Sequence, residues 1–584
     1  MDGSHRSALL QVGIGIAMVV VSVLAPILLG NQYWAHNFLL VNLFVAVAVL
    51  QNVVLSDAGQ ASFGQGAVFG ISAYTVGIVS GLWGFSFLTG VAAGVGAAVL
   101  LGLCFAGPAL RVQGHYLGFV TLSAALVFPE MLVALNDYTN GINGIARPVP
   151  ELTRPIFAGI SGIALLVIAF TSACLIGHAW LRRLKLGRAM RVAAASPEAA
   201  VTLGSSPGVL RFVAFTAAAF GTGIAGALYV PVLGFVSPYA FRVDLSIFFF
   251  FSVIIGGQGR ILGPVLGTWI LYLVPNALLV DLAIYRLLGY GVVALLIMLA
   301  FPDGMVGSIE NALRRHRLRR RIEDVSVAPV LTAVAPAKAG PVATVAPIAV
   351  SQARKTYGKM VALDGVTLSV APGRIHGLVG PNGSGKTTLL NAISGLIRLD
   401  GGSVVINGTA TAGLPASAIA RLGVGRTFQT PRVFEDMSIW DNLRIGADAT
   451  QAGDQSWLLA ALEKQRPDWQ AQLPDLVPHA QRRLLEVLRI VATDADILLL
   501  DEPAAGLSPE ERRSFVALLR LLRDRFGKTI VLIEHDLKLV WQVADSITVL
   551  DAGRVVAEGV PAEIMQSPQV RALFTGSSAE PAHA

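Results

Sequence analysis

Long apolar runs fill roughly the first 310 residues, whereas residues after about 350 have the mixed pattern of a soluble domain. About 20 consecutive apolar residues cross a bilayer as a helix. Runs near this length predict ten spans, at 9–29, 37–55, 62–80, 84–107, 116–136, 157–180, 209–233, 243–257, 262–281 and 283–301. Two of them, 62–80 and 243–257, are short enough to be re-entrant segments instead. The pattern predicts an all-α polytopic membrane domain over residues 1–312, with about ten transmembrane helices.

The composition also places much of the chain in lipid. Of the 584 residues, 54% are hydrophobic and only 14% are charged, whereas soluble domains carry about 25% charged residues. The two cysteines, Cys104 and Cys174, both lie in apolar runs, which argues against a disulfide framework or a cysteine metal site. No small-residue cleavage site follows the first apolar run, so we expect a retained span rather than a removed signal peptide.

Basic residues gather at the ends of the apolar runs and give the chain a net charge of +7. The cluster at 314–321 could bind nucleic acid, but beside a span it is more typical of a cytoplasmic anchor at anionic headgroups. Ten spans place this cluster, Arg6, Arg111, the run 182–188 and Arg260 on one side of the membrane. We therefore predict a multi-pass protein of the cytoplasmic (inner) membrane whose N-terminus and soluble domain are cytoplasmic. Lipid is the expected partner and nucleic acid is not.

The segment 55–75 is rich in glycine and small polar residues. Small residues allow close helix packing in membranes, which is the simpler explanation. The alternative is a broken helix that lines a polar path, with Asp57, Gln60 and Gln65 turned inward. Glu130 is a charge within a predicted span and raises the same question.

The loop 181–208 between two spans contains a short amphipathic helix. Ser196 can cap the start of this helix, and Gly204 can end it. The helix carries Glu198, Ala199 and Ala200. It is either an ordinary loop helix or a protruding helix that docks into a partner's groove and transmits motion.

Residues 313–347 are basic and then rich in Ala, Pro and Val, which predicts an extended tether. A soluble domain is expected over 348–575, followed by a flexible tail over 576–584.

The soluble domain carries a phosphate-binding loop of the form G-x-x-x-x-G-K-[ST] between an apolar stretch and a helical one. Glycines let backbone N–H groups surround phosphate at a helix N-terminus. Lys386 would reach the β- and γ-phosphates of ATP, and the Thr387 hydroxyl would bind Mg²⁺. The predicted nucleotide-binding residues are Tyr357, whose ring can stack on adenine, and Gly380, Pro381, Asn382, Gly383, Ser384, Gly385, Lys386, Thr387 and Thr388.

Two adjacent acids follow the apolar run 497–500. Asp501 is predicted to hold Mg²⁺, and Glu502 is the candidate base that positions the attacking water. His535 follows a second apolar run and is the candidate contact of the γ-phosphate.

These residues resemble those of ABC-transporter ATPases. The segments "RTFQ" (426–429), "DEPAAGLSP" (501–509) and "VLIEHDLKLV" (531–540) are similar to the branched-chain amino acid importer ATPase in particular. The resemblance implies an α/β P-loop NTPase domain of ABC type, in which Gln429 contacts Mg²⁺ and the attacking water. Lys386, Gln429, Glu502 and His535 are then the catalytic residues, and Thr387, Gln429 and Asp501 hold the metal. ATP and Mg²⁺ are the expected cofactors.

The first half resembles one permease subunit of the same importer family over most of residues 35–310. The similar segments are "GQASFGQGAVFGISAYT" (59–75), "TNGINGI" (139–145), "GRAMRVAAASPEAAVTLG" (187–204), "VIIGGQGRILGPVLG" (253–267) and "FPDGMVG" (301–307). The resemblance identifies Glu198, Ala199, Ala200 and Gly204 as a coupling-helix motif. It also implies a second permease subunit, a second ATPase subunit and an extracytoplasmic solute-binding protein as partners.

One short motif departs from the family pattern. Two such ATPases close head to tail, and each phosphate-binding loop faces the partner's signature, usually L-S-x-G-Q. The matching positions here are Val477, Pro478, His479, Ala480 and Gln481. Pro478 lacks both a hydroxyl and an N–H but suits the first turn of a helix, and Ala480 adds a methyl group where close approach is needed. The degenerate signature predicts hetero-assembly, in which the partner's signature serves Lys386 and Glu502 of this chain.

The sequence therefore favours ATP-driven import of a small amino-acid-like solute, most simply a branched-chain amino acid, by a fused permease and ATP hydrolase. Urea or short amides are alternative solutes. The coupling motif argues against an exporter, and the weak signature leaves a non-transporting regulatory ATPase open.

Overall fold

The computed structural model describes residues 3–110, 115–157, 159–278, 286–317, 346–449, 457–470, 472–474 and 477–575. The chain divides into two compact units. A helical unit comprises Met1–Ala195 and Pro207–Arg319, and an α/β unit comprises Ser196–Ser206 and Arg320–Ala584. The predicted loop helix thus belongs to the α/β unit. The predicted tail and most of the predicted tether lie outside the described residues.

Eight helices of the described helical unit are long and apolar enough to cross a membrane. They are built from α1 (Gly3–Leu28), α2 (Gln32–Asn52) with η1 (Val53–Asp57), α3 (Gln65–Val76) with η2 (Gly77–Leu82), α4 (Phe87–Ala109), α5 (His115–Ala134), α8 (Gly162–Arg183), α11 (Pro207–Leu233), and η4 (Pro238–Phe241) with α12 (Val243–Gly256). These eight coincide with the first eight predicted spans, including the two short ones.

The last two predicted spans correspond to α13 (Gly263–Leu278) and α14 (Arg286–Ala300), whose described parts have 16 and 15 residues. The described residues thus contain eight of the ten predicted spans as helices long enough to cross a membrane. Residues 279–285 between them lie outside the described part. The amphipathic helix α15 (Gly304–Arg317) follows and extends five residues into the predicted tether.

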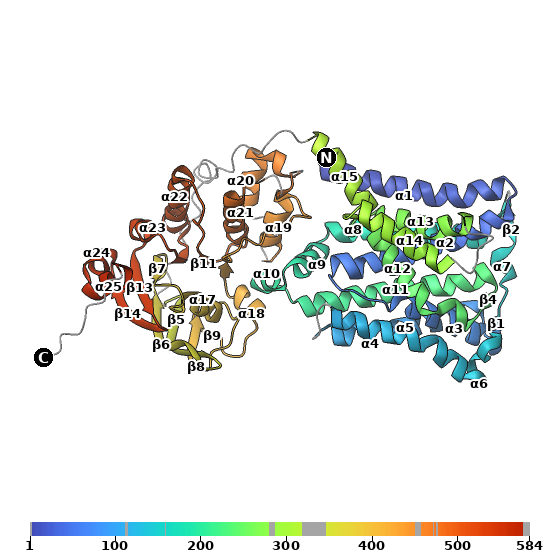
Figure 1. The fold of residues 1–584 in the computed structure, drawn as a ribbon, viewed down its shortest axis with the longest axis horizontal. Coiled ribbons are helices and arrows are strands. Elements are labelled where there is room, and N and C mark those ends of the chain that lie inside the picture. The colour runs from blue at the N-terminus through green and yellow to red at the C-terminus, as the bar shows by residue number, and fades with distance from the viewer. Residues whose placement is uncertain are drawn as a thin grey trace. The chain divides into compact units, whose positions relative to one another are not determined.

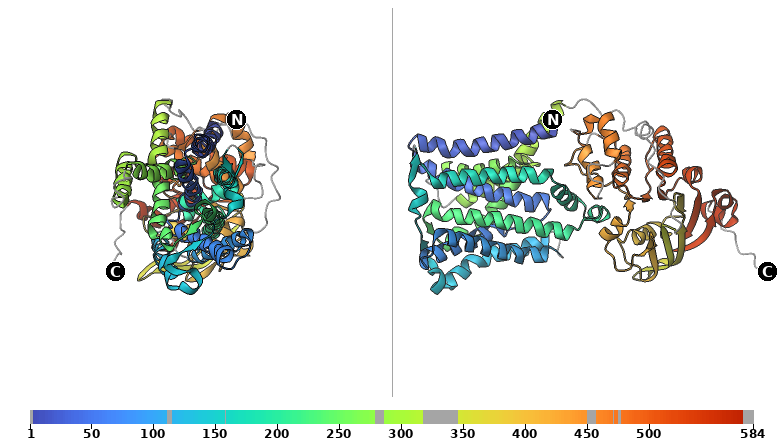
Figure 2. Two further views of the ribbon diagram at one scale, coloured as in Figure 1. Left: turned by 90° about the vertical axis from the view of Figure 1, so that its right-hand side faces the viewer. Right: turned by 180° about the vertical axis from the view of Figure 1, so that it is seen from behind.

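Glycines bring the helices of this unit into close contact. A Cβ added at Gly102 on α4 would lie 2.2 Å from Ala219 Cβ on α11. One added at Gly66 on α3 would lie 2.3 Å from the Ser246 hydroxyl oxygen on α12. The long helices lie alongside one another in both side-on views (Figures 1 and 2). Small residues thus serve close packing in the segment 55–75, as the simpler explanation predicted.

Short elements cover one end of the helices, and α9 (Lys185–Ala195) lies at the other end (Figure 1). The strand β1 (Ile145–Ala146) pairs antiparallel with β4 (Phe235–Val236). The other short elements are α6 (Asn136–Thr139), η3 (Gly141–Asn143), α7 (Pro150–Thr153), β2 (Pro155–Phe157) and β3 (Ile160–Ser161).

The α/β unit contains a six-stranded sheet in the order β10-β11-β12-β7-β13-β14. All neighbouring pairs are parallel except β13 with β14. The strands are β10 (Val424–Arg426), β11 (Ile497–Asp501), β12 (Thr529–Ile533), β7 (Ile375–Val379), β13 (Ser546–Asp551) and β14 (Arg554–Gly559). Because parallel strands end at one edge, the segments after β7, β11 and β12 meet there.

A second, antiparallel sheet has the order β6-β5-β8-β9. Its strands are β5 (Ile348–Tyr357), β6 (Met360–Val370), β8 (Gly401–Ile406) and β9 (Thr409–Ala410). The helical elements of the unit are α10 (Pro197–Thr202), α17 (Lys386–Ile393), α18 (Ala416–Arg421), α19 (Ile439–Asp448), α20 (Trp457–Gln465), η7 (Pro467–Gln470), α21 (His479–Ala492), α22 (Pro509–Phe526), α23 (Leu537–Val543), α24 (Pro561–Gln566) and α25 (Pro568–Thr575).

Candidate functional site

The predicted phosphate-binding loop joins the buried strand β7 to helix α17. Its glycines are structurally required: Gly380, Gly383 and Gly385 have φ of 155°, 80° and 100°. A Cβ at Gly380 would lie 2.1 Å from the Leu550 carbonyl oxygen. A side chain at these positions would be strained or would clash with neighbouring main chain. Glycine therefore leaves the N–H groups at the N-terminus of α17 accessible to an anion.

Lys386 begins α17 and folds back over this loop. Its Nζ donates to the carbonyl oxygens of Gly380 and Pro381, each at 2.8 Å. Burial lowers the pKa of Lys386, whereas Glu502 and Asp501 raise it. Thr387, the predicted metal ligand, is exposed next to it.

Glu502, Gln429 and His535 converge at the edge where the parallel strands end. Gln429 Nε2 donates to Glu502 Oε1 at 3.2 Å, and His535 Nε2 lies 2.7 Å from the same oxygen. Glu502 has a φ of 50°, unusual for a residue with a side chain. Such strain is common at functional sites and persists where the surroundings hold the residue in place. Here the Glu502 N–H donates to the Ile533 carbonyl, and its own carbonyl accepts from Arg483 Nη1.

Asp501 ends β11 and is 2% exposed. Burial raises the pKa of its carboxyl, which the Arg426 guanidinium, 3.9 Å from Oδ2, partly offsets. Its other oxygen, Oδ1, is buried and accepts no hydrogen bond from the described residues. A buried carboxylate oxygen without a partner fits a hard cation, and so do the neutral oxygens of Thr387 and Gln429. Among the described residues no group of three or more His, Cys, Asp or Glu side chains forms a separate metal site.

Tyr357, the predicted adenine contact, lies at the end of β5 with 46% of its surface exposed. Lys355 Nζ is 5.5 Å from its ring centroid. The paired strand β6 passes directly over the phosphate-binding loop, because a Cβ at Gly385 would lie 2.5 Å from the Ala362 carbonyl oxygen. An exposed aromatic face near this loop fits base stacking.

The degenerate signature forms the turn before α21. Val477 is buried in the core, and Pro478 occupies the N-cap of α21 with φ −52° and ψ 144°. Its carbonyl accepts from the N–H groups of Gln481 and Arg482 at 2.9 and 3.1 Å. The Pro478 side chain makes no capping hydrogen bond to the helix. Pro478 thus lies one residue before the predicted first turn, because its extended ψ cannot belong to the helix itself.

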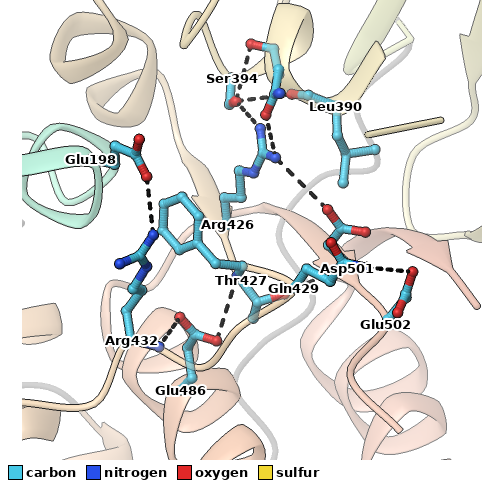
Figure 3. Close-up of polar contacts among 12 residues, drawn as sticks. Glu198, Leu390, Ser394, Arg426, Thr427, Gln429, Arg432, Glu486, Asp501 and Glu502 are labelled. Atoms are coloured by element: carbon cyan, nitrogen blue, oxygen red, sulfur yellow. Dashed lines mark hydrogen bonds and ion pairs between the residues drawn. The ribbon is translucent and has the colours of Figure 1, made fainter. Parts of the chain in front are cut away.

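The loop helix α10 packs on the α/β unit through buried Ala199 and Ala200. The Ser196 hydroxyl caps it by accepting from the Ala199 N–H at 3.3 Å, and Gly204 ends it at φ 76°. Arg421 on α18 donates to the Gly204 carbonyl at 3.1 Å. Glu198 lies 3.4 Å from Arg432 in the loop after β10 (Figure 3). The predicted cap and end are confirmed.

In the helical unit, the helix of segment 55–75 is broken between η1 and α3. Asp57, Gln60 and Gln65 are 1%, 2% and 4% exposed, as predicted for residues that turn inward. Asp57 Oδ2 lies 2.8 Å from His178 Nε2 on α8. Glu130 is exposed on the surface of this unit and therefore does not line a path through its interior.

Several polar residues that no sequence motif marked hold the site together. Arg426 donates to the Ser394 hydroxyl, and the Thr427 hydroxyl accepts from the Asp501 N–H at 3.0 Å (Figure 3). Glu534 Oε1 accepts from the Ala504 N–H at 2.6 Å. Glu486 on α21 is 1% exposed and binds the loop after β10. Glu486 and Arg489 lie in a run with the pattern of an ordinary amphipathic helix, so the sequence carried no signal for that pair.

Comparison with known proteins gives the same division of the chain. Residues 33–301 match the family described as branched-chain amino acid transport system / permease component, and residues 363–505 match the ABC transporter family. The high-affinity branched-chain amino acid transport ATP-binding protein LivG of Escherichia coli K12 is 36% identical over 241 residues, which are 38% of this chain and 94% of LivG. Its counterpart BraF of Pseudomonas aeruginosa is 35% identical over 244 residues, with 38% and 94% covered. A solved nucleotide-free ATP-binding cassette from an ABC transporter is 26% identical and covers 40% of this chain and 100% of its own, with a TM-score of 0.35.

Fold, site and relatives define a membrane permease fused to an ATP hydrolase that is coupled to transport. The chain belongs to the branched-chain amino acid family of ABC transporters. The predicted fusion of permease and ATPase in one chain is confirmed.

Proposed function

We propose that the chain imports a small amino-acid-like solute, with branched-chain amino acids as the first candidates. The observation that carries this proposal is the agreement between the two halves. The permease half matches a branched-chain amino acid permease family, and the ATPase half is similar to ATP-binding proteins of branched-chain amino acid transport. Two independent parts of one chain therefore suggest the same class of solute.

At the nucleotide site, we assign the phosphates of ATP to the loop 380–388 and Lys386. Mg²⁺ would be held by Asp501 Oδ1, the Thr387 hydroxyl and the Gln429 side-chain oxygen, and it would neutralise charge on the phosphates. Glu502 would orient the attacking water, because a partly exposed carboxylate beside the γ-phosphate position can accept its proton. Gln429 and His535 hold this carboxylate in place through their contacts of 3.2 and 2.7 Å.

The assembly we propose is asymmetric. Pro478 offers no hydroxyl to a phosphate, and its N-cap position leaves α21 without a side-chain cap. A second ATPase subunit with a complete signature would serve the site of this chain, while residues 477–481 face the partner's phosphate-binding loop. A second permease subunit and an extracytoplasmic solute-binding protein would complete the complex.

The orientation we propose places the N-terminus and the ATPase on the cytoplasmic side, where ATP is available. Arg182 and Arg183 end α8 and Lys185 begins α9, so the loop that carries α10 is strongly basic. Basic loops of this kind stay cytoplasmic. The helix α10 then acts as the coupling helix, since it already packs on the ATPase of the same chain.

Uptake of labelled leucine, valine and urea by cells with and without the gene tests the solute. We expect gene-dependent uptake of leucine or valine that Lys386→Ala abolishes. Gene-dependent uptake of urea alone would overturn the amino acid proposal. Uptake that Lys386→Ala leaves unchanged would contradict ATP-driven import by this chain.

ATP hydrolysis by the purified chain alone tests the asymmetric assembly. We expect slow turnover that a second ATPase subunit accelerates. Brisk hydrolysis by the chain alone, abolished by Glu502→Gln, would contradict hetero-assembly while leaving the transporter assignment in place.

A further inference from the structure

The helix α21 carries a buried ion pair that neither the ATP site nor the signature turn contains. Glu486 and Arg489 lie one turn apart on α21, with Glu486 Oε1 3.2 Å from Arg489 Nη2. Their side chains are 1% and 3% exposed. Charges this deeply buried persist only where partners satisfy them.

Those partners are main-chain groups of the loop that carries Gln429. Glu486 Oε2 accepts from the Phe428 N–H at 3.4 Å, and Oε1 accepts from the Arg432 N–H at 3.3 Å. Arg489 Nη1 donates to the Arg432 carbonyl at 2.5 Å. The pair therefore holds both main-chain polar groups of Arg432 and the N–H of the residue just before Gln429. Figure 3 shows the contacts of Glu486 with this loop.

The two ends of this loop lead to two functional regions. Thr427 precedes it, and its hydroxyl accepts from the Asp501 N–H on β11. Arg432 ends it, and its side chain reaches Glu198 on α10 at 3.4 Å. The Arg432 side chain thus belongs to the contact with the loop helix, while its main chain belongs to α21.

We propose that Glu486 and Arg489 are positioning residues that make the Gln429 loop and helix α21 move as one body, so that displacement of α10 reaches Gln429 through Arg432. The proposal rests on the proposed roles of α10 and Gln429. Neither Glu486 nor Arg489 touches nucleotide in this arrangement, and both act through the loop main chain.

Burial explains why this connection is stiff. A hydrogen bond to a buried charge is stronger than a neutral one, and leaving either charge without its partner is costly. Sliding the loop along α21 would expose Glu486 to an apolar surrounding without its two N–H donors. Contacts between two side chains can break when either one changes rotamer. The contacts here join a side chain to main-chain groups of the loop, which have no rotamers.

The Glu486→Gln variant tests the proposal. ATP hydrolysis and solute uptake are measured for the full transporter complex in membranes. Gln keeps the shape and one acceptor but removes the charge that both N–H groups and Arg489 need. We expect kcat for ATP to fall about tenfold with KM for ATP changed less than about twofold, and uptake to fall in parallel. A purely structural role would instead lower the amount of folded complex and leave kcat per folded complex unchanged, which would overturn the proposal.

The matched control uses another carboxylate that binds an arginine of α21. Glu435 Oε1 lies 3.0 Å from Arg482 Nη1, but its side chain is 64% exposed. Glu435→Gln should leave kcat within about twofold of the unchanged protein, since exposed ion pairs contribute little. If Glu435→Gln matches the loss caused by Glu486→Gln, the buried pair has no special role and the proposal fails.

A double-mutant cycle tests whether displacement of α10 passes through this pair. Glu198→Gln alone should lower uptake about threefold, because its ion pair is exposed. If both residues act on one connection, adding Glu198→Gln to Glu486→Gln should cause little further loss. Losses that multiply would overturn the serial arrangement.

A further variant, Arg489→Lys, keeps the charge but cannot bind Glu486 and the Arg432 carbonyl together, and it should reproduce the fall in kcat.

These outcomes separate the proposal from the proposed function. Absence of ATP-driven uptake by the unchanged complex would contradict the proposed transport function. Normal transport by the Glu486→Gln complex would contradict only the positioning role of Glu486 and Arg489.

Discussion

The N-termini of α17 and α21 differ in the features that favour binding of an anion. The N-terminus of α17 follows a loop with three glycines at positive φ and begins with Lys386. The N-terminus of α21 follows Pro478, has no side-chain cap and has Val477 buried behind it. The first is built for close approach by a ligand, and the second is built only to start a helix.

The difference separates two roles of α21 that are usually combined. Its N-terminal turn carries Pro478, which offers no hydroxyl to a phosphate, whereas its interior carries the buried ion pair of Glu486 and Arg489. If residues 477–481 are the signature, as proposed, then a helix without the phosphate contact still binds the Gln429 loop through Glu486 and Arg489.

The largest expected effect concerns the acid beside the intact phosphate loop. Glu502→Gln should lower ATP hydrolysis by the complex about 10³-fold, because a positioned general base contributes about 10²–10⁴-fold. Phosphate release measures it, with Glu510→Gln, an exposed acid on α22, as the control. A loss smaller than tenfold would mean that the site of this chain is not the working one.

A somewhat smaller loss is expected from the phosphate loop itself. Lys386→Ala removes a cation aimed at the phosphates and should lower kcat/KM about 10²-fold. Nucleotide binding and hydrolysis measure it, and the exposed Lys538→Ala serves as control. Unchanged ATP binding and hydrolysis in Lys386→Ala would show that the N-terminus of α17 is no more important for phosphate binding than that of α21.

The strand beneath the phosphate loop should respond to acid. His376 on β7 is 1% exposed, and its ring nitrogens lie 2.8 and 2.9 Å from the Ser546 and Thr548 hydroxyls. Burial lowers the pKa of His376 to about 4. Between the unfolded value of about 6.5 and pH 4 the unfolded chain binds more protons, so the free energy of unfolding falls as pH falls, by up to ~3 kcal/mol.

Thermal unfolding of the intact protein across this pH range, compared with His376→Gln, measures that contribution. The variant should lose stability less steeply between pH 6.5 and 4. Equal slopes for both proteins would show that His376 is not held neutral in the folded state.

The smallest effect is expected from repair of the signature turn. Pro478→Ser with Ala480→Gly should change ATP hydrolysis by less than about twofold, because the turn faces the partner's site in a hetero-assembly. In a homo-assembly the same repair would supply missing phosphate contacts to both sites, and such contacts contribute about 10²–10³-fold. A rise of tenfold or more would therefore contradict the proposed asymmetry.

Much of this arrangement follows from local sequence patterns. Eight spans, the phosphate loop and the ends of α10 are each specified by neighbouring residues, so periodicity and capping rules were sufficient. Gln429, Glu502 and His535 were each predicted to act at the nucleotide, and the structure shows Gln429 and His535 both in contact with Glu502.

Other features depend on contacts between distant residues and could not be predicted. Glu486 lies in a run that has the pattern of an ordinary amphipathic helix, and its partners are main-chain groups 54 and 58 residues away. Main-chain donors leave no trace in residue type. The last two predicted spans, at α13 and α14, border residues 279–285, which lie outside the described part of the chain.

The division of Arg432 between main chain and side chain has an evolutionary consequence. Substitution of Arg432 changes the side chain that meets α10 but leaves the Arg432 N–H and carbonyl that Glu486 and Arg489 bind. Proline at 432 is the exception, because it would remove the N–H. Position 432 can therefore adapt to a different coupling helix while the loop stays bound to α21 and Gln429 stays in place.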